Sequence, residues 1–128
     1  MLEGSCLCGN ITFAVTGTPQ GVSACQCGQC RKQSGHVFAA ARARKDAVVF
    51  DADETLRWYR ASGEAARGFC GACGATLFWR ADEGDSIRVA LGSLERPSGL
   101  RLGRHVWVEA KGDYYDIADG VREERGEP

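Results

Sequence analysis

Long apolar runs and a surplus of charge of one sign are both missing from this chain of 128 residues. No stretch approaches the roughly 18 consecutive apolar residues that a membrane span needs, and the N-terminus MLEGSCLCGN lacks the apolar segment of a signal peptide. The formal net charge is -1, with basic and acidic residues mixed along the sequence. The missing basic surplus argues against a nucleic-acid partner, and the missing apolar run against a membrane. We therefore expect a cytoplasmic protein.

A helical period sustained over ten residues or more is also missing, as is any internal repeat. Short runs with the alternation of half-buried strands stand between turn-rich segments, in which many of the 17 glycines lie. These runs are 10–15, 37–41, 47–51, 55–60, 75–80, 86–91 and 105–110. The only helix we expect is a short one within 28–34. The pattern predicts a mainly β protein.

The length favours one domain over residues 1–128, because a chain of this size buries a core without help from disulfides. Hydrophobic residues make up 44% and charged residues 26%, the balance of a globular protein. We expect the core to span about residues 3–120, and the charged tail VREERGEP (121–128) to be frayed.

Cysteine is the residue type that the chain has in excess. There are seven, an odd number, and a reducing cytoplasm does not sustain disulfides. They cluster at gaps of one and two residues, whereas cysteines that only fill a core are scattered. Zinc holds sulfur at about 2.3 Å, so its neighbouring ligands must come from one tight turn or one strand face. The spacing therefore predicts metal binding.

Two pairs of cysteines, Cys6 with Cys8 and Cys70 with Cys73, are each followed directly by glycine. Glycine permits a left-handed turn that brings backbone amides toward the sulfurs. Together the pairs supply the four thiolates of a closed tetrahedral zinc site. Such a site would tie the N-terminal strand to a distant hairpin and link metal binding to folding.

The remaining three, Cys25, Cys27 and Cys30, would leave one tetrahedral position open, as catalytic zinc sites do. A site of three thiolates is soft and suits another sulfur as its fourth ligand. Three ligands also hold zinc less tightly than four, so this is the more labile of two zinc ions expected per chain. Two alternatives stay open at this point. One is a zinc ribbon that pairs Cys27 and Cys30 with Cys70 and Cys73, and the other is a redox role for either CxxC motif.

Four segments, in order, resemble the GFA family, named for glutathione-dependent formaldehyde-activating enzyme: GSCLCGNITF, CQCGQCRKQSG, RGFCGACGATLFWR and HVWVEAKGDYYDIADG. The resemblance covers nearly the whole chain and implies a β-tent-like fold of packed antiparallel sheets stapled by zinc. It also implies a structural zinc and a catalytic zinc, held respectively by Cys6, Cys8, Cys70 and Cys73 and by Cys25, Cys27 and Cys30.

The same resemblance implies a carbon–sulfur lyase or synthase that acts on the adduct of a thiol, glutathione, with formaldehyde or a related small carbonyl. The alternative is a zinc-stabilised module that binds glutathione or a partner protein without turnover. Gln26 departs from the family, whose members commonly carry histidine there. Glutamine is no base near neutral pH, but its amide can bond a substrate or a sulfur.

Three residues are candidate substrate contacts: Gln26, Arg31 and Ser34. Arg31 could pair with the carboxylates of glutathione, and Ser34 could donate to a substrate, although local capping is the commoner use of such a serine. His36 and His105, the two histidines, either face the site or act structurally. Trp107 is a candidate wall of the pocket.

Overall fold

The computed structural model describes residues 1–126, which form eleven strands, one α-helix and three short 3-10 helices. In chain order the strands are β1 (Leu2–Ser5), β2 (Thr12–Val15), β3 (Gln20–Cys25), β4 (Phe38–Arg44), β5 (Val48–Ala52), β6 (Leu56–Tyr59), β7 (Ala65–Cys70), β8 (Thr76–Ala81), β9 (Ser86–Ala90), β10 (Arg104–Val106) and β11 (Arg122–Glu123). The helices are α1 (Gly28–Ser34), η1 (Lys45–Ala47), η2 (Leu91–Ser93) and η3 (Val108–Ala110). The mainly β fold and the short helix within 28–34 are confirmed. Within residues 1–126, no helix has the length and apolarity needed to cross a membrane.

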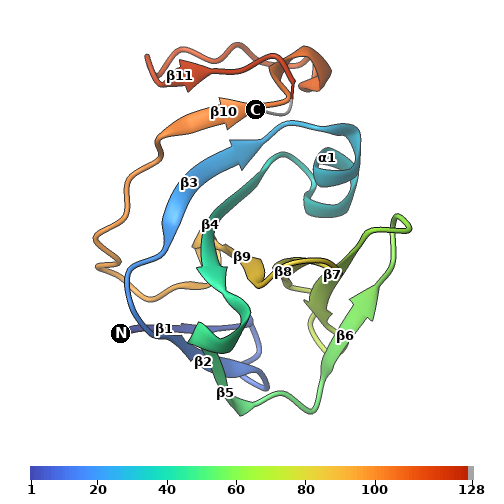
Figure 1. The fold of residues 1–128 in the computed structure, drawn as a ribbon. Helices are drawn as coiled ribbons and strands as arrows, with labels where there is room; N and C mark the ends of the chain where they lie inside the picture. The colour runs from blue at the N-terminus through green and yellow to red at the C-terminus, as the bar shows by residue number, and fades with distance from the viewer. Residues whose placement is uncertain (127–128) are drawn as a thin grey trace.

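The strands make two sheets. β1, β2 and β5 form a three-stranded antiparallel sheet, and the others form an eight-stranded sheet in the order β11-β10-β3-β4-β9-β8-β7-β6. Pairing in the large sheet is antiparallel from β3 to β6, whereas β10 runs parallel to both β3 and β11. In Figure 1 the small sheet lies at the bottom, and β10, β11 and the C-terminal segment lie at the top, near α1.

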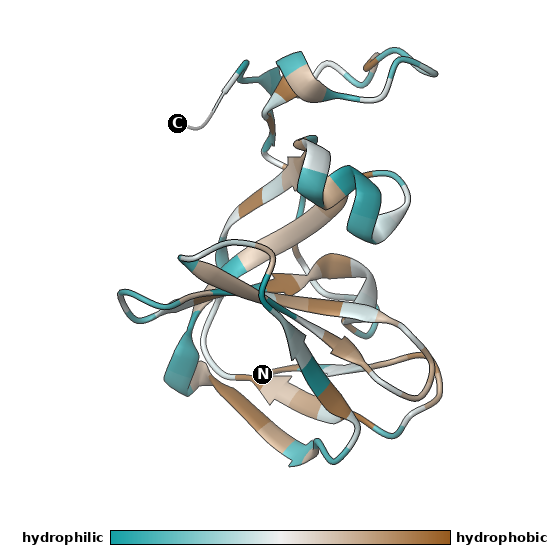
Figure 2. Cartoon of the chain, turned by 90° about the vertical axis from the view of Figure 1, so that its right-hand side faces the viewer, coloured by the Kyte–Doolittle hydropathy of each residue, from teal (hydrophilic) through white to brown (hydrophobic). Residues whose placement is uncertain are grey.

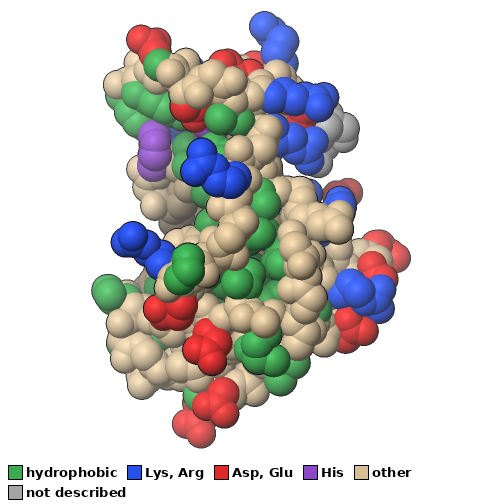
Figure 3. Space-filling model, turned by 90° about the vertical axis from the view of Figure 1, so that its left-hand side faces the viewer, with side chains coloured by type: hydrophobic (Ala, Val, Ile, Leu, Met, Phe, Trp, Pro, Cys, Tyr) green, Lys and Arg blue, Asp and Glu red, His purple; other side chains and the backbone are tan. Residues whose placement is uncertain are grey.

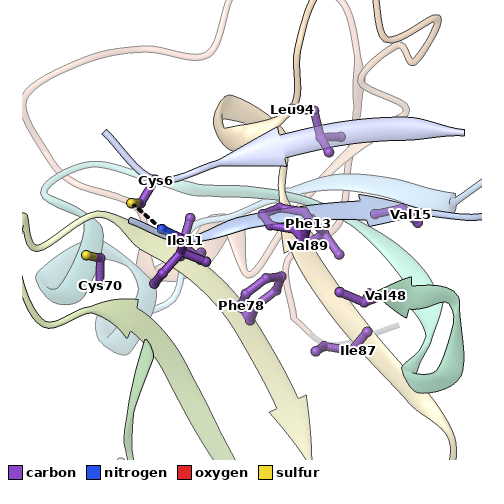
Figure 4. Close-up of a cluster of buried hydrophobic side chains, with 11 residues drawn as sticks. Cys6, Ile11, Phe13, Val15, Val48, Cys70, Phe78, Ile87, Val89 and Leu94 are labelled. Atoms are coloured by element: carbon purple, nitrogen blue, oxygen red, sulfur yellow. Dashed lines mark hydrogen bonds between the residues drawn. The ribbon is translucent and has the colours of Figure 1, made fainter. Parts of the chain in front are cut away.

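The main hydrophobic core gathers side chains of both sheets (Figure 4). At its centre the Phe78 ring meets the Phe13 ring edge to face, with centroids 5.1 Å apart. The buried members are Cys6, Ile11, Phe13, Val15, Val48, Cys70, Leu77, Phe78, Ile87, Val89 and Leu94.

The large sheet also uses its second face, because side chains alternate along each strand. On β8, Phe78 packs into the main core while its neighbour Trp79 packs against a smaller cluster. That cluster lies beneath α1 and consists of Cys30, Phe38, Ala40 and Ala90. Helix α1 is mostly hydrophilic (Figure 2), and Cys30 is its one buried residue. The alternation thus gives the molecule a second, less apolar face on which a site can form.

Four strands were not predicted: β1, β3, β7 and β11. β3 and β7 contain glycine and alanine, which have low strand propensity. In β7, packing requires the smallest residue at one position. A Cβ on Gly68 of β7 would lie 3.0 Å from the Trp58 ring and 3.1 Å from the Phe78 ring. Tertiary contacts therefore override local propensity in this strand.

The C-terminal predictions need two corrections. The strand expected over 105–110 ends at Val106, because Trp107 adopts a left-handed φ of 58° and the chain turns into η3. The tail is not frayed over 121–126, since β11 pairs with β10 and the Arg104 guanidinium forms an ion pair with Glu124 at 3.0 Å. Residues 127–128 lie outside the described part of the chain.

Candidate metal sites and the adjoining cavity

Four cysteines converge from two turns. Cys6 and Cys8 lie in the β1–β2 connection, and Cys70 and Cys73 lie at the β7–β8 turn; their sulfurs are all within 4.8 Å of one another. The Cys8 sulfur is 3.6 Å from that of Cys6 and 3.8 Å from that of Cys70. Four sulfurs placed tetrahedrally around zinc at about 2.3 Å are about 3.8 Å apart. The donor set and its spacing therefore fit a closed zinc site.

Backbone amides and a hydroxyl surround these sulfurs. The amide of Ile11 donates to Cys6 at 3.3 Å, and the amide of Cys73 donates to Cys70 at 3.4 Å. A hydrogen bond from Thr55, together with the backbone amides of Cys73 and Ala72, lowers the pKa of Cys70 to about 6. Both turns also have the left-handed glycine that their sequences suggested, Gly9 at φ 82° and Gly74 at φ 80°. The β7–β8 turn thus stabilises the thiolate of Cys70, the form of cysteine that binds metal.

The four-cysteine cluster lies at one end of the main core. Cys70 is fully buried and Cys6 is 5% exposed, and Figure 4 shows their sulfurs at the same end of the cluster. Cys8 lies outside the core, beside the exposed Leu7. The cluster thus joins the small sheet to the β7–β8 hairpin of the large one.

The other three cysteines form a separate cluster on the second face of the large sheet. Cys25 ends β3, Cys27 caps α1 by accepting the Cys30 amide at 3.4 Å, and Cys30 lies in the first turn of the helix. Their sulfurs are also within 4.8 Å of one another. Since Cys27 and Cys30 group with Cys25, the ribbon pairing with Cys70 and Cys73 is wrong.

The redox alternative finds partial local support, because Cys27 does cap a helix that follows a strand. However, β3 and β4 on either side of α1 are antiparallel, so there is no βαβ crossover at this CxxC motif. A third sulfur, from Cys25, also shares the cluster. This arrangement favours metal binding over a dithiol pair.

Arg67 is a site residue that the sequence reasoning missed. It lies on β7, is only 4% exposed, and holds its Nη1 and Nη2 atoms each 3.6 Å from the Cys30 sulfur. Hydrogen bonding from Cys25 and the nearby Arg67 charge lower the pKa of Cys30 to about 6. The hydrogen bond to Cys30 and burial raise the pKa of Cys25. The cluster therefore favours a thiolate at Cys30, next to a buried cation.

A cavity of about 200 Å³ opens beside the three sulfurs. Aromatic rings and three arginines line it, and no described lining residue is acidic. Arg67 is engaged with α1 and Arg104 with Glu124, whereas Arg88 has no hydrogen bond or ion pair to any described side chain. The lining residues are Ser23, Cys25, Cys27, Gln29, Cys30, Phe38, Ala40, Arg67, Trp79, Arg88, Arg104, Val106 and Trp107. The cavity thus suits a small ligand that carries negative charge.

Gln26 does not line this cavity. Its side chain is 1% exposed; its Nε2 donates to His105 Nδ1 at 3.2 Å, and its Oε1 accepts from the Tyr115 hydroxyl at 2.8 Å. His105 Nε2 in turn donates to Asp119 at 2.9 Å. The amide that we expected to contact substrate instead fastens the C-terminal segment to the start of α1. His105 accordingly has a structural role.

Arg31 and Ser34 are also absent from the cavity lining. The Ser34 hydroxyl donates to the Cys30 carbonyl at 2.6 Å, the local use that is common for serine at a helix end. His36 lies at the surface with its Nδ1 2.6 Å from the Tyr114 hydroxyl. Trp107, by contrast, does form part of the wall, as predicted.

Comparisons with known proteins show which family has this arrangement of cysteines. A crystal structure of a Rhodobacter sphaeroides protein is similar to this chain, with a TM-score of 0.62 and 27% sequence identity, over 77% of this chain and 90% of that one. The comparison with curated proteins gives no significant match. Residues 1–110 match the family model described as glutathione-dependent formaldehyde-activating enzyme, GFA. With both cysteine clusters assembled as the resemblance implied, the chain belongs to the GFA family.

Proposed function

We propose that this protein makes or breaks the carbon–sulfur bond between glutathione and formaldehyde, or a related small carbonyl, at the three-cysteine cluster. One observation carries the proposal: three convergent sulfurs line a cavity that is otherwise bordered by aromatic rings and arginines. A four-ligand cluster elsewhere in the chain already fits a closed structural zinc site. The three-sulfur cluster is therefore available as a catalytic metal site.

Zinc is the metal that we assign to both clusters, because thiolate ligands are soft and tetrahedral sulfur sets are typical of zinc. Held by Cys25, Cys27 and Cys30, it would supply a Lewis acid with one open position, which lowers the pKa of an arriving thiol. A reducing compartment such as the cytoplasm would keep the seven cysteines as thiols.

The chain's own residues bind and orient the substrate. Arg88 places positive charge on the cavity wall, where it attracts a carboxylate of glutathione. Trp79 and Trp107 narrow the cavity with apolar surface and limit the access of water. The glutathione sulfur then attacks the carbonyl carbon. A C–S bond forms, the C=O π bond opens, and the oxygen takes up a proton to give the S-hydroxymethyl adduct.

Proximity supplies most of the rate gain that this reaction needs, since thiols and formaldehyde also combine without a catalyst. The test is the rate at which the zinc-loaded protein forms S-hydroxymethylglutathione from glutathione and formaldehyde, followed by NMR against the uncatalysed rate. We expect acceleration by the wild-type protein and none by Cys27→Ser. Glutathione binding without acceleration would instead support the non-catalytic binding module.

A further inference from the structure

A site built from cysteines faces a problem of selectivity when its substrate is an aldehyde. Cys25, Cys27 and Cys30 all line the cavity that the carbonyl must enter. Thiolates are the nucleophilic form of cysteine, so each of the three sulfurs competes with the arriving thiol. The reaction stays productive only if the protein's own sulfurs are less reactive than the substrate's.

Two of the three sulfurs, those of Cys27 and Cys30, receive N–H donors. The backbone amide of Cys30 donates to Cys27 at 3.4 Å. Cys30 lies within α1, where the following amide is committed to the helix: the Arg31 amide donates to the Cys27 carbonyl at 2.8 Å. Its donor comes from outside the helix, from Arg67 on β7.

The guanidinium of Arg67 lies against Cys30 although burying its charge is energetically unfavourable. Its guanidinium is buried, and the hydrogen-bond partners of its Nη atoms among the described residues all lie on α1: the Cys30 sulfur at 3.6 Å, Gln33 Oε1 at 3.4 Å and Gln29 Oε1 at 3.3 Å. Its Nε is buried without a hydrogen-bond partner among the described residues. A buried cation is unfavourable unless an anion compensates it, and the Cys30 thiolate is the anion within reach.

The chemical effect of these donors follows from the link between basicity and nucleophilicity. A hydrogen bond to a thiolate stabilises its charge, and a less basic thiolate attacks carbon more slowly. A charged donor has about twice the effect of a neutral one. We propose that Arg67 is a positioning residue that suppresses the nucleophilicity of Cys30, so that the carbonyl reacts with the arriving thiol and not with the site itself. The inference rests on the proposed function, because it assumes zinc-bound thiolates and a carbonyl substrate.

The test measures the reactivity of each sulfur separately. Zinc-loaded protein is treated with limiting iodoacetamide at pH 7, which forms an S–C bond and releases iodide, and the labelled cysteines are quantified by peptide mass spectrometry. In Arg67→Gln we expect Cys30 to label about tenfold faster, with Cys25 and Cys27 little changed. Arg67→Lys keeps the charge and one donor, so its Cys30 should label at an intermediate rate.

Arg88→Gln is the matched control, because it removes the same charge from the same cavity without touching a sulfur. Iodoacetamide is neutral, so this variant should label Cys30 at the wild-type rate. If Arg67→Gln does not fold, Arg67→Lys still tests the inference. A labelling rate of Cys30 in Arg67→Lys equal to that of the wild type would contradict it.

Zinc analysis of the same samples distinguishes a failure of this inference from a failure of the proposed function. Two zinc ions per chain with unchanged Cys30 labelling in Arg67→Gln would overturn the inference alone. One zinc ion per chain in the wild-type protein, with no second ion after zinc is added, would overturn both the inference and the proposed zinc chemistry. The three-cysteine cluster would then hold no metal-bound thiolate whose reactivity Arg67 could lower.

Discussion

The two cysteine clusters are built from the same residue type but differ in how far apart their members lie in the sequence. The four-cysteine cluster joins turns that lie 62 residues apart, as in the contact between Cys8 and Cys70, and it lies at one end of the main core. The three-cysteine cluster comes from one short segment, Cys25 to Cys30, on the other face of the large sheet. Ligands that are distant in sequence constrain the fold, whereas ligands within one turn cannot join distant parts. Sequence span thus distinguishes the cluster that can constrain the fold from the cluster that cannot.

The strongest way to break this comparison is to remove a ligand from the four-cysteine cluster. Cys73 is half-buried and outside the main buried core, so Cys73→Ser chiefly removes a ligand. We expect the free energy of unfolding to fall by more than about 5 kcal/mol, which is comparable to the whole stability of a small domain. Circular dichroism and thermal unfolding would measure it. A folded Cys73→Ser variant with unchanged melting temperature would contradict the structural assignment.

The matched substitution in the other cluster should leave the fold intact. Serine is a good helix N-cap, so Cys27→Ser keeps the start of α1 while it removes one of three ligands. We expect turnover to fall at least about 100-fold, with the second zinc lost and the melting temperature nearly unchanged. If this variant unfolds as readily as Cys73→Ser, the division between the two clusters fails.

The charge around the three-cysteine cluster gives a finer test. Because Arg88 lines the cavity and its side chain has no hydrogen bond or ion pair to the side chains of residues 1–126, Arg88→Gln should raise the KM for glutathione about tenfold. The KM for an uncharged thiol, 2-mercaptoethanol, should stay the same. An equal rise for both thiols would show that Arg88 shapes the cavity and does not recognise a carboxylate.

The smallest expected effect concerns the C-terminal segment that covers the start of α1. The amide of Val121 and the side chain of His105 lower the pKa of Asp119 below its usual value. A lowered folded pKa stabilises the protein above the unfolded value, near 4, and this contribution is lost as the pH falls through the folded pKa. Asp119→Asn should therefore lower the melting temperature at pH 7 by about 2 °C, with the difference from wild type shrinking below pH 4. A constant difference from pH 7 to pH 3 would contradict this assignment.

Sequence reasoning anticipated both clusters because metal ligands are recognised by residue type and spacing, and these two properties can be read directly from a sequence. It also found most antiparallel strands from their alternation. It missed β3 and β7, and in β7 the contacts of Gly68 with Trp58 and Phe78 require the smallest residue.

The cavity wall was harder to foresee. Arg67 lies 37 residues from Cys30 in the sequence, so only strand pairing brings it to the sulfur. Gln26 stands between two ligands and therefore looked like a substrate contact, but alternation turns it to the opposite side, toward His105. A useful signal was present: an arginine among the small residues of AARGFC is unexpected in a buried strand unless it has an anionic partner.

Charge is distributed differently on the outer surface and in the cavity. On the face shown in Figure 3, hydrophobic side chains gather across the middle of the molecule, with acidic side chains below them. The cavity beside Cys25, Cys27 and Cys30 has the opposite character, because arginines are the charged residues among its described lining. The positive charge of the cavity wall is therefore a local feature that the net charge of -1 does not reveal.

The most direct test of the account is the zinc content per chain of the reduced protein, measured by elemental analysis before and after brief treatment with a mild chelator. Circular dichroism is recorded on the same samples. We predict two zinc ions that fall to one with the fold intact, because the three-ligand site releases its metal first. Loss of both ions together with unfolding, or a single ion that added zinc does not raise to two, would contradict the division into a structural and a catalytic site.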